Sequence, residues 1–144
     1  MSDYKLLLVC TGNTCRSPMA EVMAREVLAG REGVSVSSAG VSAVDGMPAT
    51  EEAVEAMREL GLDLSGHRSR SLTREMVAEA DQVYTLTASH RRAVLELVPE
   101  AEVKVQRLES GGDIADPVGG SLAMYRETAA QIRRGLEARL GPAG

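Results

Sequence analysis

Residues 9–18 read Val-Cys-Thr-Gly-Asn-Thr-Cys-Arg-Ser-Pro and place Cys10 six positions before Arg16. The apolar run over residues 6–9 precedes this stretch and a helix-like pattern follows it, which predicts a thiol between a buried strand and a helix. Free backbone N–H groups and the helix dipole would favour ionisation of that thiol. The same N–H groups would bind an oxyanion, and Arg16 could hold it through two parallel hydrogen bonds. A nucleophile and an anion cradle in one loop predict phosphoryl transfer through a phosphocysteine.

Two simpler interpretations compete with a catalytic loop. Cys10 could be a buried structural thiol, since free cysteine is among the most buried residue types, and Arg16 could be a surface arginine at a helix start. Gly12 and Asn13 favour the catalytic interpretation, because they most easily adopt the positive φ that turns several N–H groups inward. Ser17 could donate its hydroxyl to the Cys10 sulfur, or cap the helix that Pro18 begins, or do both.

The loop sequence resembles that of the low-molecular-weight protein tyrosine phosphatase family, and it is most similar to the branch of bacterial protein-arginine phosphatases. Three more segments carry the resemblance: Ser38-Ala39-Gly40, Gly66-His67-Arg68-Ser69-Arg70 and Asp116-Pro117-Val118-Gly119-Gly120-Ser121. The resemblance spans residues 6 to about 140 of the 144, which implies a single phosphatase domain over residues 1–144.

Residue roles follow from the loop chemistry together with this resemblance. Cys10 is the expected nucleophile, and Arg16 is expected to hold the equatorial oxygens of the phosphoryl group. The expected phosphate-binding residues are Thr11, Gly12, Asn13, Thr14, Cys15 and Arg16. The resemblance implies a supporting hydrogen-bond network, whose expected members are Asn13, Ser38 and His67. The other histidine, His90, has the pattern of an exposed helix residue and receives no role.

Asp116 is the expected general acid, which would protonate the leaving group and later take a proton from water. By itself an Asp-Pro pair indicates only a turn, but the phosphatase-like loop favours a catalytic role. Pro117 is expected to support it. Asp113 is the nearby competitor, although it lacks the following proline of the family pattern.

Thr14 and Val118 are the expected determinants of specificity. Tyrosine-specific relatives often carry a bulky aliphatic residue in place of Thr14 and aromatic residues after the Asp-Pro pair, whereas Val118 is followed here by two glycines. A threonine at this loop position resembles the arginine phosphatases, although their pattern has phenylalanine in place of Val118. The sequence therefore favours phosphoarginine in proteins as substrate, with phosphotyrosine as the alternative.

Cys10 and Cys15 are the only two cysteines, and a disulfide between them would be geometrically plausible and could protect an oxidised Cys10. A packing role for Cys15 stays open. An arsenate reductase of the same family would need a third cysteine. A phosphocysteine carrier of a sugar-transport system would need neither Arg16 nor Asp116, and a phosphopeptide-binding module would have lost Cys10.

Composition limits the remaining classes. The net charge of −5 argues against a nucleic-acid partner and means that anion binding must be local to the loop. The chain lacks a long apolar tract and a signal-peptide pattern, and two cysteines in one loop are no disulfide framework and no zinc site. We therefore expect a cytoplasmic, monomeric enzyme that needs no metal or cofactor. It should act on phosphorylated proteins or peptides and release inorganic phosphate.

Strand and helix patterns alternate along the chain, which predicts βαβ units. Predicted strands cover residues 6–9, 34–38, 82–86 and 103–105, the last extending at most to 108. Predicted helices run from Ser17 up to Gly30 and over residues 48–60, 89–98 and 121–140, and a further short helix begins at residue 73. This is an α/β fold of three αβα layers, with a four-stranded parallel sheet covered by helices on both faces. The family resemblance adds the strand order 2-1-3-4.

Overall fold

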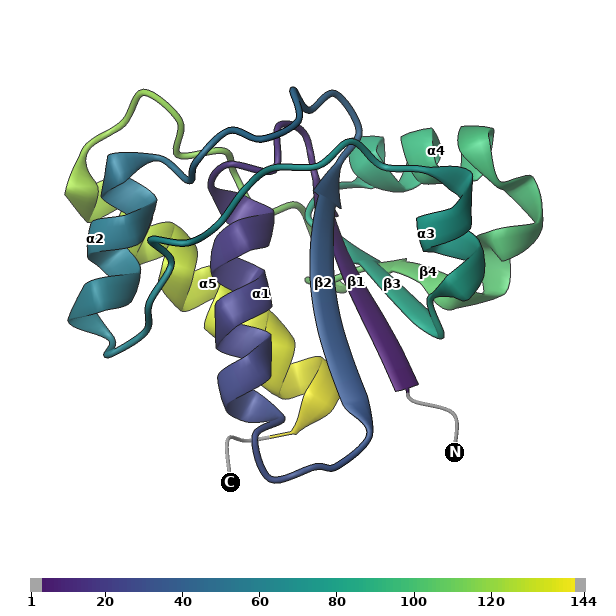
Figure 1. Ribbon diagram of the computed structural model, residues 1–144, viewed down its shortest axis with the longest axis horizontal. Helices are drawn as coiled ribbons and strands as arrows, with labels where there is room; N and C mark the ends of the chain where they lie inside the picture. Colours follow the sequence, from purple (N-terminus) through teal and green to yellow (C-terminus); the bar gives the residue numbers. More distant parts are fainter. Residues whose placement is uncertain (1–3, 142–144) are drawn as a thin grey trace.

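A computed structural model describes residues 4–141 and contains a four-stranded parallel sheet (Figure 1). The strands are β1 (Tyr4–Cys10), β2 (Val34–Gly40), β3 (Gln82–Thr85) and β4 (Val105–Arg107), in the order β2-β1-β3-β4. Every adjacent pair is parallel, with Cys10 opposite Gly40 at the carboxyl end of β1. The predicted sheet and its order are confirmed.

Helices cover both faces of this sheet, as predicted (Figure 1). On one side lie α1 (Arg16–Val27), α2 (Glu51–Glu59) and α5 (Leu122–Leu140); on the other lie α3 (Arg74–Glu79), α4 (Ala88–Leu97) and the 3-10 helix η1 (Pro99–Lys104). Alternate side chains of β1 pack against the helices on opposite faces of the sheet. Leu6 and Leu8 belong to the core under α1, α2 and α5, whereas Leu7 and Val9 belong to the core under α3 and α4. The unbroken apolar run is thus explained by a strand that is buried on both faces.

The helix starts explain where free N–H groups remain. Side-chain oxygens of Thr50, Thr73, Thr87 and Ser121 accept hydrogen bonds at the first turns of α2, α3, α4 and α5. Helix α1 begins at Arg16 after Cys15, and no side chain caps it. The prediction that Ser17 caps this helix is therefore wrong, because Ser17 is already its second residue. The uncapped first turn of α1 faces the loop that leaves β1.

The fourth strand is shorter than predicted. Residues 99–104 form the 3-10 helix η1, so β4 begins only at Val105, and Val103 is 91% exposed. Pro99 suits the first turn of such a helix and cannot donate to a strand. The prediction of a strand that begins at residue 103 is therefore wrong, because the apolar residues 103 and 105 belong to different elements.

The strand order puts the loop after β1 at a functional position in such folds. From β1 the chain passes to β2 at the edge of the sheet and then returns past β1 to β3. The direction in which strands are added therefore reverses at β1. Open parallel sheets bind ligands at the carboxyl ends of strands beside such a reversal. Within residues 4–141, no helix is long and apolar enough to cross a membrane.

Candidate active site

The loop between β1 and α1 packs closely against the end of β2. A Cβ atom added to Gly40 would lie 2.4 Å from the carbonyl oxygen of Thr11 and 2.9 Å from the backbone nitrogen of Asn13. Only glycine permits this approach. The Ser-Ala-Gly motif of β2 therefore forms the side wall of the loop.

Asn13 holds the loop in its conformation. It is the only non-glycine residue of the described chain with a positive φ, 57°, and it is fully buried. Its Oδ1 accepts from the backbone N–H of Arg70 at 2.9 Å, and its Nδ2 donates to Ser17 Oγ at 2.8 Å and Ser38 Oγ at 2.9 Å. These three bonds stabilise a backbone conformation that L-residues seldom adopt.

The same bonds determine where the hydroxyl proton of Ser17 goes. Ser17 Oγ accepts from Asn13, so its own proton is free for Cys10 Sγ, which lies 2.8 Å away. A hydroxyl that donates to sulfur stabilises the thiolate over the thiol. Ser17 is fully buried and Cys10 is 2% exposed, so water does not compete for this contact.

Two further side chains extend the network away from Cys10. Ser38 Oγ accepts from Asn13 and donates to Glu21 Oε1 at 2.5 Å. His67 Nε2 lies 2.7 Å from the carbonyl oxygen of Asn13, so that nitrogen carries the proton. The structure thus joins Asn13, Ser38 and His67, which the sequence placed in one network, and adds Glu21.

Arg16 is buried, with 4% exposure, and its guanidinium is held from two sides. Nη1 donates to the carbonyl oxygen of Ile114 at 2.9 Å; Nη2 lies 3.4 Å from Thr11 Oγ1 and 3.5 Å from Asp116 Oδ2. Nε is buried and has no partner among the described residues. Because an unpaired buried donor costs free energy, this N–H indicates that the loop is built to bind an anion.

His90 is a site residue that the sequence analysis missed. The expectation of an exposed side chain is wrong: His90 is 4% exposed, and its Nε2 lies 2.8 Å from Thr11 Oγ1. Burial, with a contribution from the nearby Arg16 cation, lowers the pKa of His90 to about 4, so the imidazole is neutral at pH 7. A signal was present, because His90 lies four residues before the buried Val94 on the same face of α4.

The proton on Thr11 links His90 to Arg16. The guanidinium can only donate, so Thr11 Oγ1 accepts from Arg16 and is free to donate to a neutral His90. In that arrangement the proton of the neutral imidazole is on Nδ1, which is buried and has no partner among the described residues. His90 therefore orients the hydroxyl that helps to position Arg16.

Asp116 lies at the mouth of the loop. Its side chain is 43% exposed, with Oδ2 toward Arg16 and Oδ1 accepting from the backbone N–H of Val118 at 3.0 Å. The thiol of Cys15 approaches the same oxygen at 3.5 Å. Pro117 is buried and fixes the turn that holds the carboxylate beside the anion cradle.

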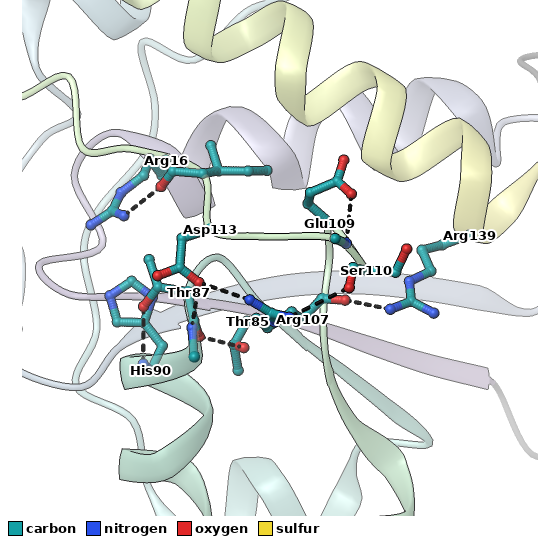
Figure 2. Close-up of polar contacts among 12 residues, drawn as sticks. Arg16, Thr85, Thr87, His90, Arg107, Glu109, Ser110, Asp113 and Arg139 are labelled. Atoms are coloured by element: carbon teal, nitrogen blue, oxygen red, sulfur yellow. Dashed lines mark hydrogen bonds and ion pairs between the residues drawn. The ribbon is translucent and has the colours of Figure 1, made fainter.

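Asp113 points to a different place. Its Oδ1 accepts from the backbone N–H of Ala88 at 2.9 Å and pairs with Arg107 at 3.3 Å, as Figure 2 shows. Its contacts therefore anchor the start of α4, and of the two aspartates only Asp116 contacts Arg16.

Thr14, Val118 and Cys15 are the remaining residues that the sequence predicted for the site. Thr14 is half-buried and Val118 is 57% exposed, so both are accessible to a substrate. Cys15 is buried, and its burial and the nearby Cys10 raise its pKa to about 12. Both cysteines are free thiols, so the Cys10–Cys15 disulfide stays a prediction.

Comparison with known proteins supports this geometry. The protein-arginine-phosphatase of Bacillus subtilis is 42% identical over 130 residues, which cover 85% of each chain. The probable low molecular weight protein-tyrosine-phosphatase EpsP of Ralstonia nicotianae is 39% identical over 135 residues, covering 92% of this chain and 91% of its own. A solved mutant of the YwlE arginine phosphatase, with a phosphorylated active-site serine, is similar at a TM-score of 0.86 and 38% identity, covering 92% of this chain and 90% of that one.

The model of a single family matches nearly all of the described chain, over residues 5–140. Its match, the relatives at about 40% identity and the shared fold agree with one another. The chain belongs to the low molecular weight phosphotyrosine protein phosphatase family.

Proposed function

We propose that this protein is a cysteine-dependent phosphatase that removes the phosphoryl group from phosphoarginine in proteins. The observation that carries the phosphatase chemistry is the buried Ser17–Cys10 contact beside Arg16, whose Nε has no partner within residues 4–141. It places a stabilised nucleophile next to a charged donor for a phosphoryl oxygen.

In the first step, the Cys10 thiolate attacks phosphorus and forms the S–P bond while the bond from phosphorus to the substrate nitrogen breaks. Asp116 gives its proton to the departing guanidine nitrogen, which leaves as guanidinium. Arg16 and the loop N–H groups hold the equatorial oxygens, where the transition-state charge resides.

In the second step, water attacks phosphorus, the S–P bond breaks, and Asp116 takes the proton of that water. The sulfur leaves as a thiolate, which the Ser17 hydroxyl stabilises by donation. Inorganic phosphate is the product. The same Asp116 thus serves as acid in one step and base in the next, at one position beside Arg16.

The positions of the aromatic residues favour phosphoarginine over phosphotyrosine. The chain has three tyrosines and neither Phe nor Trp. Tyr84 and Tyr125 are buried, and Tyr4 starts β1 at the edge of the sheet opposite the loop. A phenyl ring at the mouth of the site would therefore find no aromatic side chain to stack on, while a polar guanidinium needs none.

Phosphotyrosine is the second candidate substrate, because several relatives, EpsP among them, carry that name. Parallel hydrolysis of phosphoarginine, phosphotyrosine and phosphoserine peptides by one preparation tests the two. We expect the highest kcat/KM for phosphoarginine. A preference for phosphotyrosine would overturn the arginine assignment and leave the phosphocysteine chemistry intact.

The Thr14→Ile variant sharpens this test. A Thr14 hydroxyl can accept a hydrogen bond from a guanidinium N–H, whereas isoleucine offers only apolar bulk. A polar group left unpaired in a closed site costs about 1–3 kcal/mol, so phosphoarginine activity should fall about 5- to 150-fold. Phosphotyrosine activity should hold or rise. An unchanged ratio of the two kcat/KM values would exclude Thr14 as the determinant.

A further inference from the structure

A second basic region lies apart from the Cys10 loop. A hollow of about 480 Å³ is bounded by the start of α4, the end of β4 and the last turns of α5. Four arginines line it: Arg91, Arg92, Arg107 and Arg139. No carboxylate belongs to its lining, although the whole protein carries a net charge of −5.

Most of this positive charge is unneutralised. Among the ion pairs of the described residues, only Arg107 has a carboxylate partner, Asp113. Another hollow, of about 490 Å³ beside Glu21, also contains three arginines, but Glu21 and Asp63 line it with them. The hollow beside β4 is therefore the more strongly cationic of the two.

Backbone carbonyls hold two of these guanidinium groups in place. Arg91 Nε donates to the carbonyl oxygen of Val105 at 2.9 Å. Arg139 donates from Nη2 to the carbonyl oxygen of Arg107 at 2.6 Å, and its guanidinium carbon lies 5.3 Å from the ring centre of Tyr84. Figure 2 shows Arg139 beside the backbone of Arg107 near Ser110, with the Arg107 side chain reaching toward Asp113.

These contacts matter for binding because they fix side chains before a ligand arrives. An anchored arginine loses less conformational freedom on binding, and its remaining N–H groups stay available for an anion. Backbone carbonyl oxygens carry no formal charge, so these hydrogen bonds leave the positive charge of the arginines in place. The arrangement thus keeps the attraction for an anion and lowers the entropic cost of binding it.

We propose that this hollow is a second anion site, which binds a small ligand carrying two or more phosphate groups. The volume falls in the range of small-molecule pockets and exceeds the need of one inorganic phosphate. Several arginine side chains that line one hollow suit phosphate oxygens, which accept paired N–H bonds. This second site goes beyond the proposed phosphatase reaction, because none of the residues that line the hollow takes part in that reaction.

Inorganic tripolyphosphate is a suitable probe for titration of the full-length protein, monitored by NMR. Arginine Nε–H resonances of Arg91 and Arg139 report the hollow, and amide resonances of Gly12 and Asn13 report the Cys10 loop. The Arg92→Gln variant removes one exposed charge from α4; Arg134→Gln, which removes an exposed charge from α5 outside the hollow, is the matched control. The Arg91→Gln/Arg92→Gln double variant removes two charges and keeps the Arg107–Asp113 pair.

We expect saturable shifts of the arginine resonances with their own apparent Kd. That Kd, read from Arg139, should rise at least about tenfold in the double variant and less in Arg92→Gln, with no change in Arg134→Gln. The loop resonances should titrate equally in all four proteins.

Three results would overturn the proposal: shifts confined to the loop, an equal loss in Arg134→Gln, or stronger shifts with hexaglutamate than with tripolyphosphate. The last would make the hollow a site for acidic peptides. If only the loop resonances failed to shift, the result would count against the proposed phosphatase function and not against this site.

Discussion

The cradle around Cys10 and the loop that carries Asp116 differ sharply in how they are held. In the cradle, Asn13 and Ser17 are fully buried, and hydrogen bonds join Asn13 to Ser38 of β2 and to residues 67 and 70. The Asp116 side chain is 43% exposed and makes one contact at 3.0 Å and two at 3.5 Å. The proposed phosphate cradle is thus built into the core, whereas the proposed acid lies at the surface.

This difference indicates how one scaffold can accept different substrates. Changes at exposed positions such as Val118 leave the buried bonds of Asn13 untouched, so the group that carries the phosphate can vary while the cradle stays the same. A change inside the cradle leaves a buried donor or acceptor unpaired and affects stability and activity together.

The largest expected effect is that of Cys10→Ser. Loss of the nucleophile should lower turnover on the order of 10⁶-fold, the scale seen when a covalent nucleophile is removed. Inorganic phosphate should still bind, because the cradle is mostly backbone N–H and Arg16. Turnover by stopped assay and phosphate affinity by calorimetry check both parts; an equal loss of phosphate affinity would contradict the backbone cradle.

Asp116→Asn should slow the reaction by roughly 10²–10⁴-fold, the usual contribution of a positioned acid. The slowing should be greatest for substrates with poor leaving groups, and the melting temperature should hardly change because the side chain is exposed. Asp113→Asn is the matched control and should keep near-normal kcat. If Asp113→Asn instead shows the leaving-group dependence, the acid is Asp113.

Asn13→Ala tests the buried half of the comparison. It should lower the free energy of unfolding by roughly 2–4 kcal/mol, because it unpairs buried partners and leaves alanine at a positive φ. Asn13→Gly removes the same bonds without the φ penalty and should be less destabilised. Urea denaturation measures both, and an Asn13→Ala protein as stable as wild type would mean that the network does not hold the loop.

His90 should give the smallest effect on activity. His90→Leu removes a hydrogen bond worth about 0.5–1.5 kcal/mol, so kcat/KM should fall roughly 2- to 13-fold. His90→Gln offers an amide oxygen to Thr11 and should recover part of this loss. Equal activity of the Leu and Gln variants would show that His90 acts only by packing.

The same residue predicts a pH dependence of stability. Its pKa is about 4 in the folded protein against 6.5 for an ordinary histidine, so the unfolded chain takes up this proton first as the pH falls. The stabilisation is complete above about pH 6.5 and is lost between there and pH 4. Melting temperatures over that range should decline less steeply for His90→Gln than for wild type, and parallel curves would rule out His90 as the cause.

The sequence alone determined what depends on neighbours along the chain. Cys10, Asn13 and Arg16 lie within one turn and its strand and helix, so their spacing indicated both the loop and its chemistry. The apolar run of β1 and the alternation of helices and strands gave the αβα layers, because burial on two faces leaves a local pattern. The strand order needed the family resemblance.

Only the tertiary structure decided which distant groups complete the site. His90 and Thr11 are 79 residues apart and meet because α4 follows β3, the neighbour of β1. The same packing places Asp113 against the start of α4 and Asp116 beside Arg16, whereas the sequence favoured Asp116 only through the proline that follows it. Of the two roles expected for Ser17, the contact with Cys10 is present and the helix cap is absent, because α1 already begins at Arg16. Hydrogen bonds between segments depend on directions in space, which residue spacing does not encode.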